Sequence, residues 1–235
     1  VTGDFGYSRL FARPVLDVLF PALANTVILI GISIGLSLLI GLPAGLIAAL
    51  KPYSKLDYSI NLIAFGGISM PAFWLALLLI ILFAVTLGIL PAGGTGELAS
   101  GETWNKAHFL ILPVLTLVIS SVGGHTRYMR AAMLETLRQD YIHTAKAKGA
   151  GQTRIVLVHA LRNAMIPVVT IIALDFGFLF SGALVTETVF AYPGMGKLIF
   201  DSIMGNDFNL ALVALLLATC VTLIGNLFAD LAYAW

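Results

Sequence analysis

The sequence predicts an all-α integral membrane protein with about five transmembrane helices. The first observation behind this prediction is composition. The 235 residues are 59% hydrophobic and only 11% charged, with a mean hydropathy of +0.98, whereas soluble domains carry about 25% charged residues. The second observation is that several stretches without Asp, Glu, Lys or Arg are long enough to cross a bilayer, which takes a helix of about 20 residues.

Five spans follow from the apolar runs in chain order. Uncharged runs occupy residues 22–50, 58–96, 107–126 and 208–229, and residues 163–186 contain a single charge, Asp175. Pro91 and the glycines that follow it end the second run, so one span is expected there. The predicted spans are residues 22–50, 59–88, 108–131, 163–187 and 209–233, in a transmembrane domain of residues 22–235 after an external amphipathic lead-in at residues 1–21.

A cleaved signal peptide and an intrachain disulfide are both excluded by the sequence. A cleaved signal peptide has an apolar part of about 7–15 residues near a basic start, and the chain shows no such segment. The single cysteine, Cys220, lies inside a predicted span, so the chain has no intrachain disulfide.

The distribution of basic residues predicts the orientation, because short loops rich in Lys and Arg stay in the cytoplasm. Nine basic residues fall on one side: Lys51, Lys55, Arg127, Arg130, Arg138, Lys146, Lys148, Arg154 and Arg162. Four fall on the other: Arg9, Arg13, Lys106 and Lys197. Residues 127–162 are therefore expected in the cytoplasm and Val1 outside. Because the chain opens with Val1 and stops directly after an apolar run, we expect further segments upstream and downstream.

The long polar segment between the third and fourth spans contains a short helix. Asp140 is expected to be its N-cap, Lys146 and Lys148 suit its last turn, and Gly149 suits the left-handed position after it. The helix would be about eight residues and roughly 12 Å long. It could lie on the lipid headgroups as a basic surface helix, or it could dock a cytoplasmic partner. The small residues allow close approach, but their spacing does not decide between the two.

Four motifs resemble the permeases of bacterial ABC importers, in the dipeptide, oligopeptide and nickel branch. They are Asp140-Tyr-Ile-His-Thr-Ala-Lys-Ala-Lys-Gly149, His159-Ala-Leu-Arg-Asn-Ala-Met-Ile-Pro167, Glu187-Thr-Val-Phe-Ala-Tyr-Pro-Gly-Met-Gly196 and Ser69-Met-Pro-Ala-Phe-Trp74. The match covers essentially the whole chain in order. It implies a type I ABC importer permease in the bacterial inner membrane, with six spans in the full protein. The solutes it implies are peptides or related small solutes such as nickel chelates.

The resemblance also implies the partners. Residues 135–162 would form the cytoplasmic coupling segment, whose helix sits in a groove of a separate ATP-binding subunit that carries ATP and Mg. A second homologous permease and an extracytoplasmic solute-binding protein would complete the importer, with no role for nucleic acid. The implied coupling residues are Asp140, Tyr141, Thr144, Ala145, Ala147, Lys148 and Gly149.

The coupling segment departs from the pattern of the wider importer superfamily. His143 and Thr144 replace the Glu and first Ala of that pattern, and only Ala145 and Gly149 match it. The interval to Pro167 is also longer. A contact with the ATPase through Glu is therefore not expected here.

Catalysis by the chain itself is not expected. The only phosphate-loop candidate, Gly194 to Leu198, lacks the upstream Gly and the Ser or Thr that such a loop needs, so no nucleotide or other cofactor is predicted. An intramembrane enzyme is the least favoured alternative: Ser120, Ser121 and His125 lie at membrane depth, but no acid is near in sequence to orient the histidine. No histidine begins an H-E-x-x-H pair, so no metal site is predicted. His125 is expected to cap its span at the interface.

An ion-coupled secondary transporter is the main alternative, because acids within a membrane are functional by default. Asp175 is the candidate in mid-span, where it could pair with Asn61 or Asn226 or line the pathway. No inverted repeat stands out to support this class.

Small residues and prolines suggest where helices pack or bend. Gly31, Gly35, Ser37, Gly41 and Gly45 recur at a spacing near four that lets helices approach closely. Pro43, Pro71 and Pro167 are expected to kink or break their helices. Ordinary packing explains both features, and the functional alternative is a hinge. Pro71, Pro167 and Asp175 are the candidates for the pathway or hinge.

The outward segment from Thr188 to Phe208 predicts a turn followed by a short helix. The turn is marked by Tyr192-Pro-Gly-Met-Gly196, and Lys197 to Met204 has a helical apolar pattern. Tyr192, Lys197 and Asp201 are candidate contacts for the binding protein, and a plain connector is the alternative.

Overall fold

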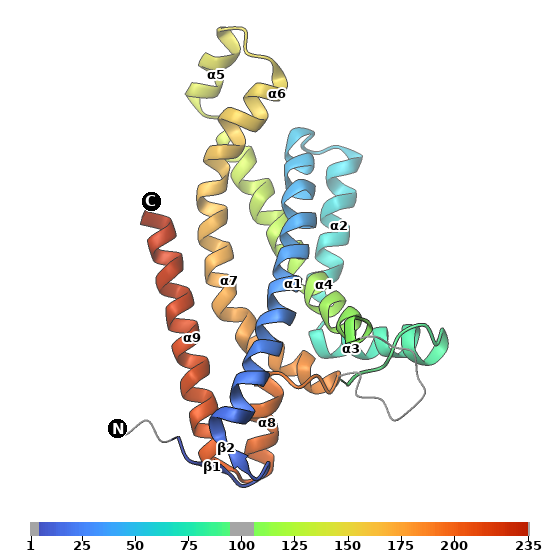
Figure 1. Cartoon of the computed structure of the whole chain (residues 1–235). Helices are drawn as coiled ribbons and strands as arrows, with labels where there is room; N and C mark the ends of the chain where they lie inside the picture. The colour runs from blue at the N-terminus through green and yellow to red at the C-terminus, as the bar shows by residue number, and fades with distance from the viewer. Residues whose placement is uncertain (1–4, 95–105, 235) are drawn as a thin grey trace. The chain divides into compact units, whose positions relative to one another are not determined.

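The computed structural model describes the backbone of residues 5–94 and 106–234 (Figure 1), and its side chains except those of residues 106, 173–182, 228–230 and 232–234. Apart from one small hairpin, the regular secondary structure of the described residues is helical. The hairpin strands are β1 (Tyr7–Ser8) and β2 (Arg13–Pro14). The helices are α1 (Val15–Leu50), α2 (Lys55–Ser69), α3 (Ala72–Leu79), η1 (Ile80–Thr86), α4 (Lys106–Thr136), α5 (Asp140–Ala147), α6 (Gln152–Arg154), η2 (Ile155–Ala160), α7 (Leu161–Val189), α8 (Met195–Met204) and α9 (Phe208–Ala234).

The spans agree with the predicted fold class. Within the described residues, four helices are long and apolar enough to cross a membrane, and a fifth span results if α2 and the helix after it count as one broken span. The break lies at Met70 and Pro71, where both residues have extended ψ angles, 127° and 135°. Pro71 cannot donate to the preceding turn, and it disfavours a helical conformation at Met70. By contrast, α1 and α7 continue through Pro43 and Pro167.

The chain divides into two compact units, each with its own core. Unit 1 comprises residues 1–34, 71–118 and 176–225, and unit 2 comprises residues 35–70, 119–175 and 226–235. The core of unit 1 joins the start of α1 to α8 and α9. Its buried members are Val15, Leu19, Ala22, Met195, Leu198, Ile199, Leu210 and Ala214.

This core explains where α1 begins. The helix starts at Val15, inside the stretch predicted as a lead-in, because Val15 and Leu19 are fully buried in the unit 1 core. Asp17 in the first turn also suits the positive end of the helix dipole.

Asp207 ties the N-terminal hairpin to the start of α9. Its carboxylate accepts hydrogen bonds from the Ser8 hydroxyl at 2.6 Å, the Leu10 amide at 3.0 Å and the Leu210 amide at 3.2 Å. The last of these makes Asp207 the N-cap of α9. Burial alone would raise the pKa of Asp207, but these hydrogen bonds to the charged form outweigh it and lower the pKa below its usual value.

The core of unit 2 includes a side chain of the short helix in the polar segment. Its buried members come from α1, α4, α5, η2 and α7: Ala49, Met129, Ala132, Met133, Ile142, Ile155, Val156, Ala160, Ala164 and Val168. The helix of the polar segment is therefore part of a packed core.

Candidate functional site

Helix α5 coincides with the predicted coupling helix, but its N-terminus differs from the prediction. The N-cap is Gln139, with extended backbone angles of −74° and 147° and no hydrogen bond from its side chain. Asp140 is already helical, so its predicted role as N-cap is wrong. An acidic residue in the first turn still stabilises the helix through the dipole, which is why both readings of the sequence fit Asp140.

The C-terminus of α5 is closed as predicted. Gly149 has a φ of +80°, the left-handed conformation that glycine adopts without strain. The Gly149 amide donates to the Lys146 carbonyl at 2.9 Å, and the Ala150 amide donates to the Ala145 carbonyl at 3.1 Å. This pair of bonds is the Schellman motif. It satisfies carbonyls at the end of α5 and fixes the direction in which the chain leaves it.

One side chain anchors α5 to the rest of unit 2. Ile142 is fully buried among Met129 and Met133 of α4 and Ile155 of η2. Tyr141 is held from the side, because the Asn163 amide donates to its hydroxyl at 2.9 Å. The helix is therefore docked on its own chain rather than lying loose on a surface.

The predicted coupling residues separate into two groups. Ala145 is half-buried and packs against the core of unit 2, so it faces its own chain. The others are exposed and form the outer face of α5 and its C-terminal turn: Asp140, Tyr141, Thr144, Ala147, Lys148 and Gly149.

Helix α8 also forms where the sequence predicted a helix, but it begins earlier, at Met195. Its N-cap is Gly194, which has no side chain to satisfy the free amides of the first turn. The carboxylate of Glu187 takes that place. It accepts from the Lys197 amide at 3.0 Å and from the Thr26 hydroxyl at 2.6 Å, and Thr26 in turn accepts from the Met195 amide at 2.7 Å.

Gly194 is required by this arrangement, because a Cβ there would overlap the Glu187 carboxylate. Glu187 and Thr26 are both buried, with 0% and 1% exposure. The sequence alone does not predict this role for either residue. The available signal was an acidic residue shortly before a helix whose own N-cap position is glycine.

A cavity of about 780 Å³ lies beside α8 in unit 1. All three predicted binding-protein contacts line it: Tyr192, Lys197 and Asp201. Lys197 forms an ion pair with Asp201 one turn further along α8. Tyr192 is buried and donates to the Asn25 carbonyl at 3.3 Å, and its burial and the nearby Glu187 charge raise its pKa to about 12. Tyr192 therefore lines the cavity although most of its side chain is covered by neighbouring residues.

His125 does not cap its span, which corrects the prediction. It is 2% exposed and lies inside α4, with its Nδ1 atom 2.7 Å from the Ser37 hydroxyl of α1. Ser121 donates to the same hydroxyl at 3.0 Å. These polar groups link α1 to α4 within unit 2. Across the described part of the chain, no group of three His, Cys, Asp or Glu residues could hold a metal ion.

Two candidate residues, Pro167 and Asp175, lie on α7. Pro167 lies within the continuous helix α7. The side chain of Asp175 lies outside the described residues, so its predicted role stays a prediction. Asn61, one of its suggested partners, donates to the Asp57 carboxylate at 2.7 Å.

Comparison with known families supplies the identity that these features suggest. Residues 41–235 match the family described as binding-protein-dependent transport system inner membrane component. The chain belongs to this family. It is therefore an inner-membrane permease subunit of an ABC importer, as the motifs indicated, and its role is transport rather than catalysis.

Three relatives are 40% or 41% identical to this permease, in alignments that cover nearly all of its length. The oligopeptide transport system permease protein AppB of Bacillus subtilis is 40% identical over 236 residues, 100% of this chain and 75% of the relative. The dipeptide transport system permease protein DppB of Haemophilus influenzae is 40% identical, covering 99% and 75%. The glutathione transport system permease protein GsiC of Escherichia coli K12 is 41% identical, covering 100% and 74%.

Solved structures support the permease fold. A chain of the MetNI methionine ABC transporter in an inward-facing conformation superposes with a TM-score of 0.76 at 19% identity, over 93% of this permease and 96% of that chain. An amino acid ABC transporter gives 0.72 at 12% identity, over 93% and 94%. At these identities the likeness concerns the fold. The comparisons give no support to ion-coupled transport through Asp175 or to an intramembrane enzyme.

Proposed function

We propose that this permease forms half of the pathway through which an ATP-driven importer carries peptides, and that α5 is the element its ATPase moves. The relatives support peptides as the solute, because their names specify oligopeptide, dipeptide and glutathione transport. Nickel chelates, the second solute class that the motifs implied, are the competing outcome of the substrate test below.

The observation that carries this proposal is the construction of α5. An isolated helix of eight residues is unstable in water, yet α5 is closed at its C-terminus by Gly149 and fixed to the core through Ile142. Its outer face remains exposed. A docked helix with an exposed face can be pushed by a partner and can pass that displacement to the helices beneath it, whereas a flexible loop would absorb the displacement.

The partners have separate places in this scheme. The ATP-binding subunits contact the exposed face of α5 and supply ATP and Mg, since the chain has no phosphate-binding loop of its own. The extracytoplasmic binding protein contacts α8 near Lys197 and Asp201, at the cavity of unit 1. A second homologous permease completes the pathway.

Two substitutions to the same residue test the role of α5. Ala147→Trp adds bulk to its exposed face, and Ala131→Trp adds the same bulk at an exposed position on α4 as the control. In the complete importer reconstituted in vesicles, we expect Ala147→Trp to detach the ATPase or to reduce uptake per ATP hydrolysed, while Ala131→Trp behaves as the unmodified protein. Full coupled transport by Ala147→Trp would overturn the assignment of α5.

The solute is tested with the same vesicles and the native binding protein. Labelled peptides of two to five residues should accumulate in an ATP-dependent manner, and unlabelled peptides should compete with them. Uptake of a nickel chelate that peptides do not inhibit would overturn the peptide proposal and leave the permease assignment intact.

A further inference from the structure

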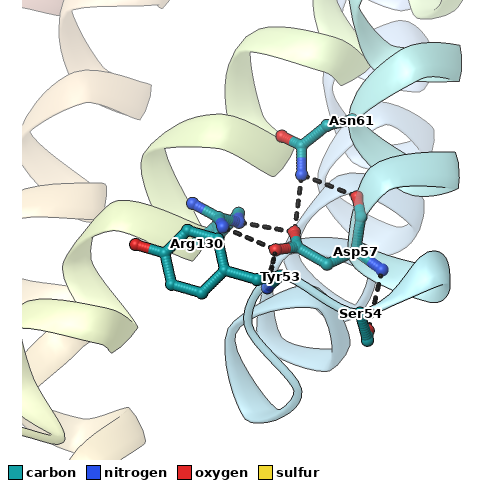
Figure 2. Close-up of polar contacts among 5 residues, drawn as sticks. All are labelled: Tyr53, Ser54, Asp57, Asn61 and Arg130. Atoms are coloured by element: carbon teal, nitrogen blue, oxygen red, sulfur yellow. Dashed lines mark hydrogen bonds and ion pairs between the residues drawn. The ribbon is translucent and has the colours of Figure 1, made fainter.

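Asp57, at the start of α2, is the centre of a buried polar cluster (Figure 2). Arg130 of α4 donates to both of its carboxylate oxygens, from Nε at 2.7 Å and from Nη2 at 2.6 Å. The same carboxylate accepts from the Tyr53 amide at 2.8 Å and from the Asn61 side chain at 2.7 Å. Side-chain exposure is 3% for Asp57 and 23% for Arg130. This bidentate geometry fixes the orientation of both side chains as well as the distance between them.

The cluster also holds the short connection between α1 and α2. Tyr53 lies in this connection with a φ of +62°, a conformation that is uncommon for a residue with a side chain. Its amide is fixed by Asp57, and the Ser54 hydroxyl accepts from the Asp57 amide at 3.2 Å as the N-cap of α2. Asp57 therefore links Arg130 to both the end of the α1–α2 connection and the first turn of α2.

Further along, α2 and α4 approach each other closely at two glycines. A Cβ on Gly67 would overlap the Ile119 carbonyl oxygen, and a Cβ on Gly123 would overlap the Ala64 carbonyl oxygen. The guanidinium of Arg127 lies 4.9 Å from the centre of the Phe65 ring, within the range of a cation–π contact.

The stretch of α4 that carries Arg130 also shares a buried core with α5. Met129 and Met133, on either side of Arg130 in the sequence, are fully buried in the same core as Ile142 of α5. One turn of α4 therefore shares an apolar core with α5 and is joined to α2 through the Asp57 ion pair.

We propose that Asp57 and Arg130 are positioning residues for transport, which make α2 follow α4 when α5 is displaced. The inference rests on the proposed role of α5. Apolar packing is not directional and tolerates rotation, whereas the paired carboxylate and guanidinium resist it. Because α2 leads directly to the break at Met70 and Pro71, a displacement of α2 reaches the point where the second span changes from one helix to the next.

The test compares the ratio of uptake to ATP hydrolysis among four variants of the complete importer. Asp57→Asn removes the charge, and Arg130→Lys keeps the charge but not the two-pronged contact. The reciprocal exchange, Asp57→Arg with Arg130→Asp, restores opposite charges. Lys55→Gln is the matched control, since Lys55 is an exposed charge in the same turn as Asp57.

We expect Asp57→Asn and Arg130→Lys to assemble with the ATPase and to hydrolyse ATP, while uptake per ATP falls by about 10-fold, a size typical of coupling between sites. The exchange should recover part of the loss, and Lys55→Gln should change nothing. A normal ratio in both single variants would overturn the inference. So would failure of all three pair variants to assemble, because the pair would then serve folding alone.

The outcomes also separate this inference from the proposed function. If Ala147→Trp on α5 uncouples transport but neither Asp57→Asn nor Arg130→Lys does, the inference fails and the role of α5 stands. If none of these variants uncouples transport, both fail.

Discussion

Removing the anchor of α5 should release this helix from the permease while leaving the spans folded. Ile142 is 0% exposed and packs among Met129, Met133 and Ile155. Truncation of a buried Ile to Ala costs about 2–5 kcal/mol, and truncation to Val about 0.5–1.5 kcal/mol. An isolated helix of eight residues cannot supply this free energy itself, because helices shorter than about 12 residues are marginal in water. The cost therefore falls on the docking of α5.

Amide hydrogen exchange measures this docking directly. Protection of the α5 amides reports the free energy of local opening, and a loss of 2 kcal/mol corresponds to about 30-fold faster exchange. We expect that acceleration at residues 144–150 in Ile142→Ala, a smaller one in Ile142→Val, and no change in the spans. Leu157→Ala is the control, since Leu157 is an apolar residue of η2 that is 51% exposed.

The functional consequence should follow the same order. Uptake per ATP hydrolysed should fall in Ile142→Ala, fall less in Ile142→Val and stay constant in Leu157→Ala. If Ile142→Ala exchanged its α5 amides as slowly as the unmodified protein, the reasoning that α5 depends on this anchor would be wrong.

Four further outcomes are expected. Gly149→Ala should destabilise α5 by about 1 kcal/mol because of its positive φ, and Gly149→Asn by less, as measured by the same amide exchange. Glu187→Ala should loosen the first turn of α8, seen as faster exchange of the Lys197 amide, whereas Thr188→Ala at the next position should not. Asp207→Asn should lower the melting temperature at pH 7; because folding lowers the pKa of Asp207, the difference should shrink as the pH falls below about 4, where the unmodified protein loses the same stabilisation. A cysteine placed at Gln152 should react with an impermeant reagent only from the cytoplasmic side; labelling from outside intact cells would reverse the predicted orientation.

The sequence was informative wherever one local rule decided the structure. Long uncharged runs predicted the spans, since few other arrangements can satisfy so much apolar surface. Gly149 was identified as the left-handed end of α5 because almost no other residue suits that position. Asp140 was misplaced by one residue since acidic side chains favour both the N-cap and the first turn of a helix.

Local rules failed where the partner is distant in the chain. Arg130 reaches Asp57 from a different helix, and Thr26 reaches Glu187 from the other end of the chain. Neither pair has a regular spacing that could have predicted it. The polarity of histidine predicts an interfacial place for His125. The structure instead buries it, with the Ser37 hydroxyl as a hydrogen-bonding partner in unit 2.

The glycines of α1 show how little a shared spacing says about a shared role. Gly41 and Gly45 lie against α4: a Cβ on Gly41 would come within 2.9 Å of the His125 Cβ, and one on Gly45 would overlap the Thr126 carbonyl oxygen. A Cβ on Gly31 or Gly35 would meet no atom within 4 Å. In lipid, helices associate through close packing and polar links rather than through the hydrophobic effect. Gly41 and Gly45 provide that close packing between α1 and α4. Arg130 provides a polar link between α4 and α2. Gly31 and Gly35 make no such contact within the described part of the chain. Packing inside this chain therefore explains Gly41 and Gly45 but not Gly31 and Gly35.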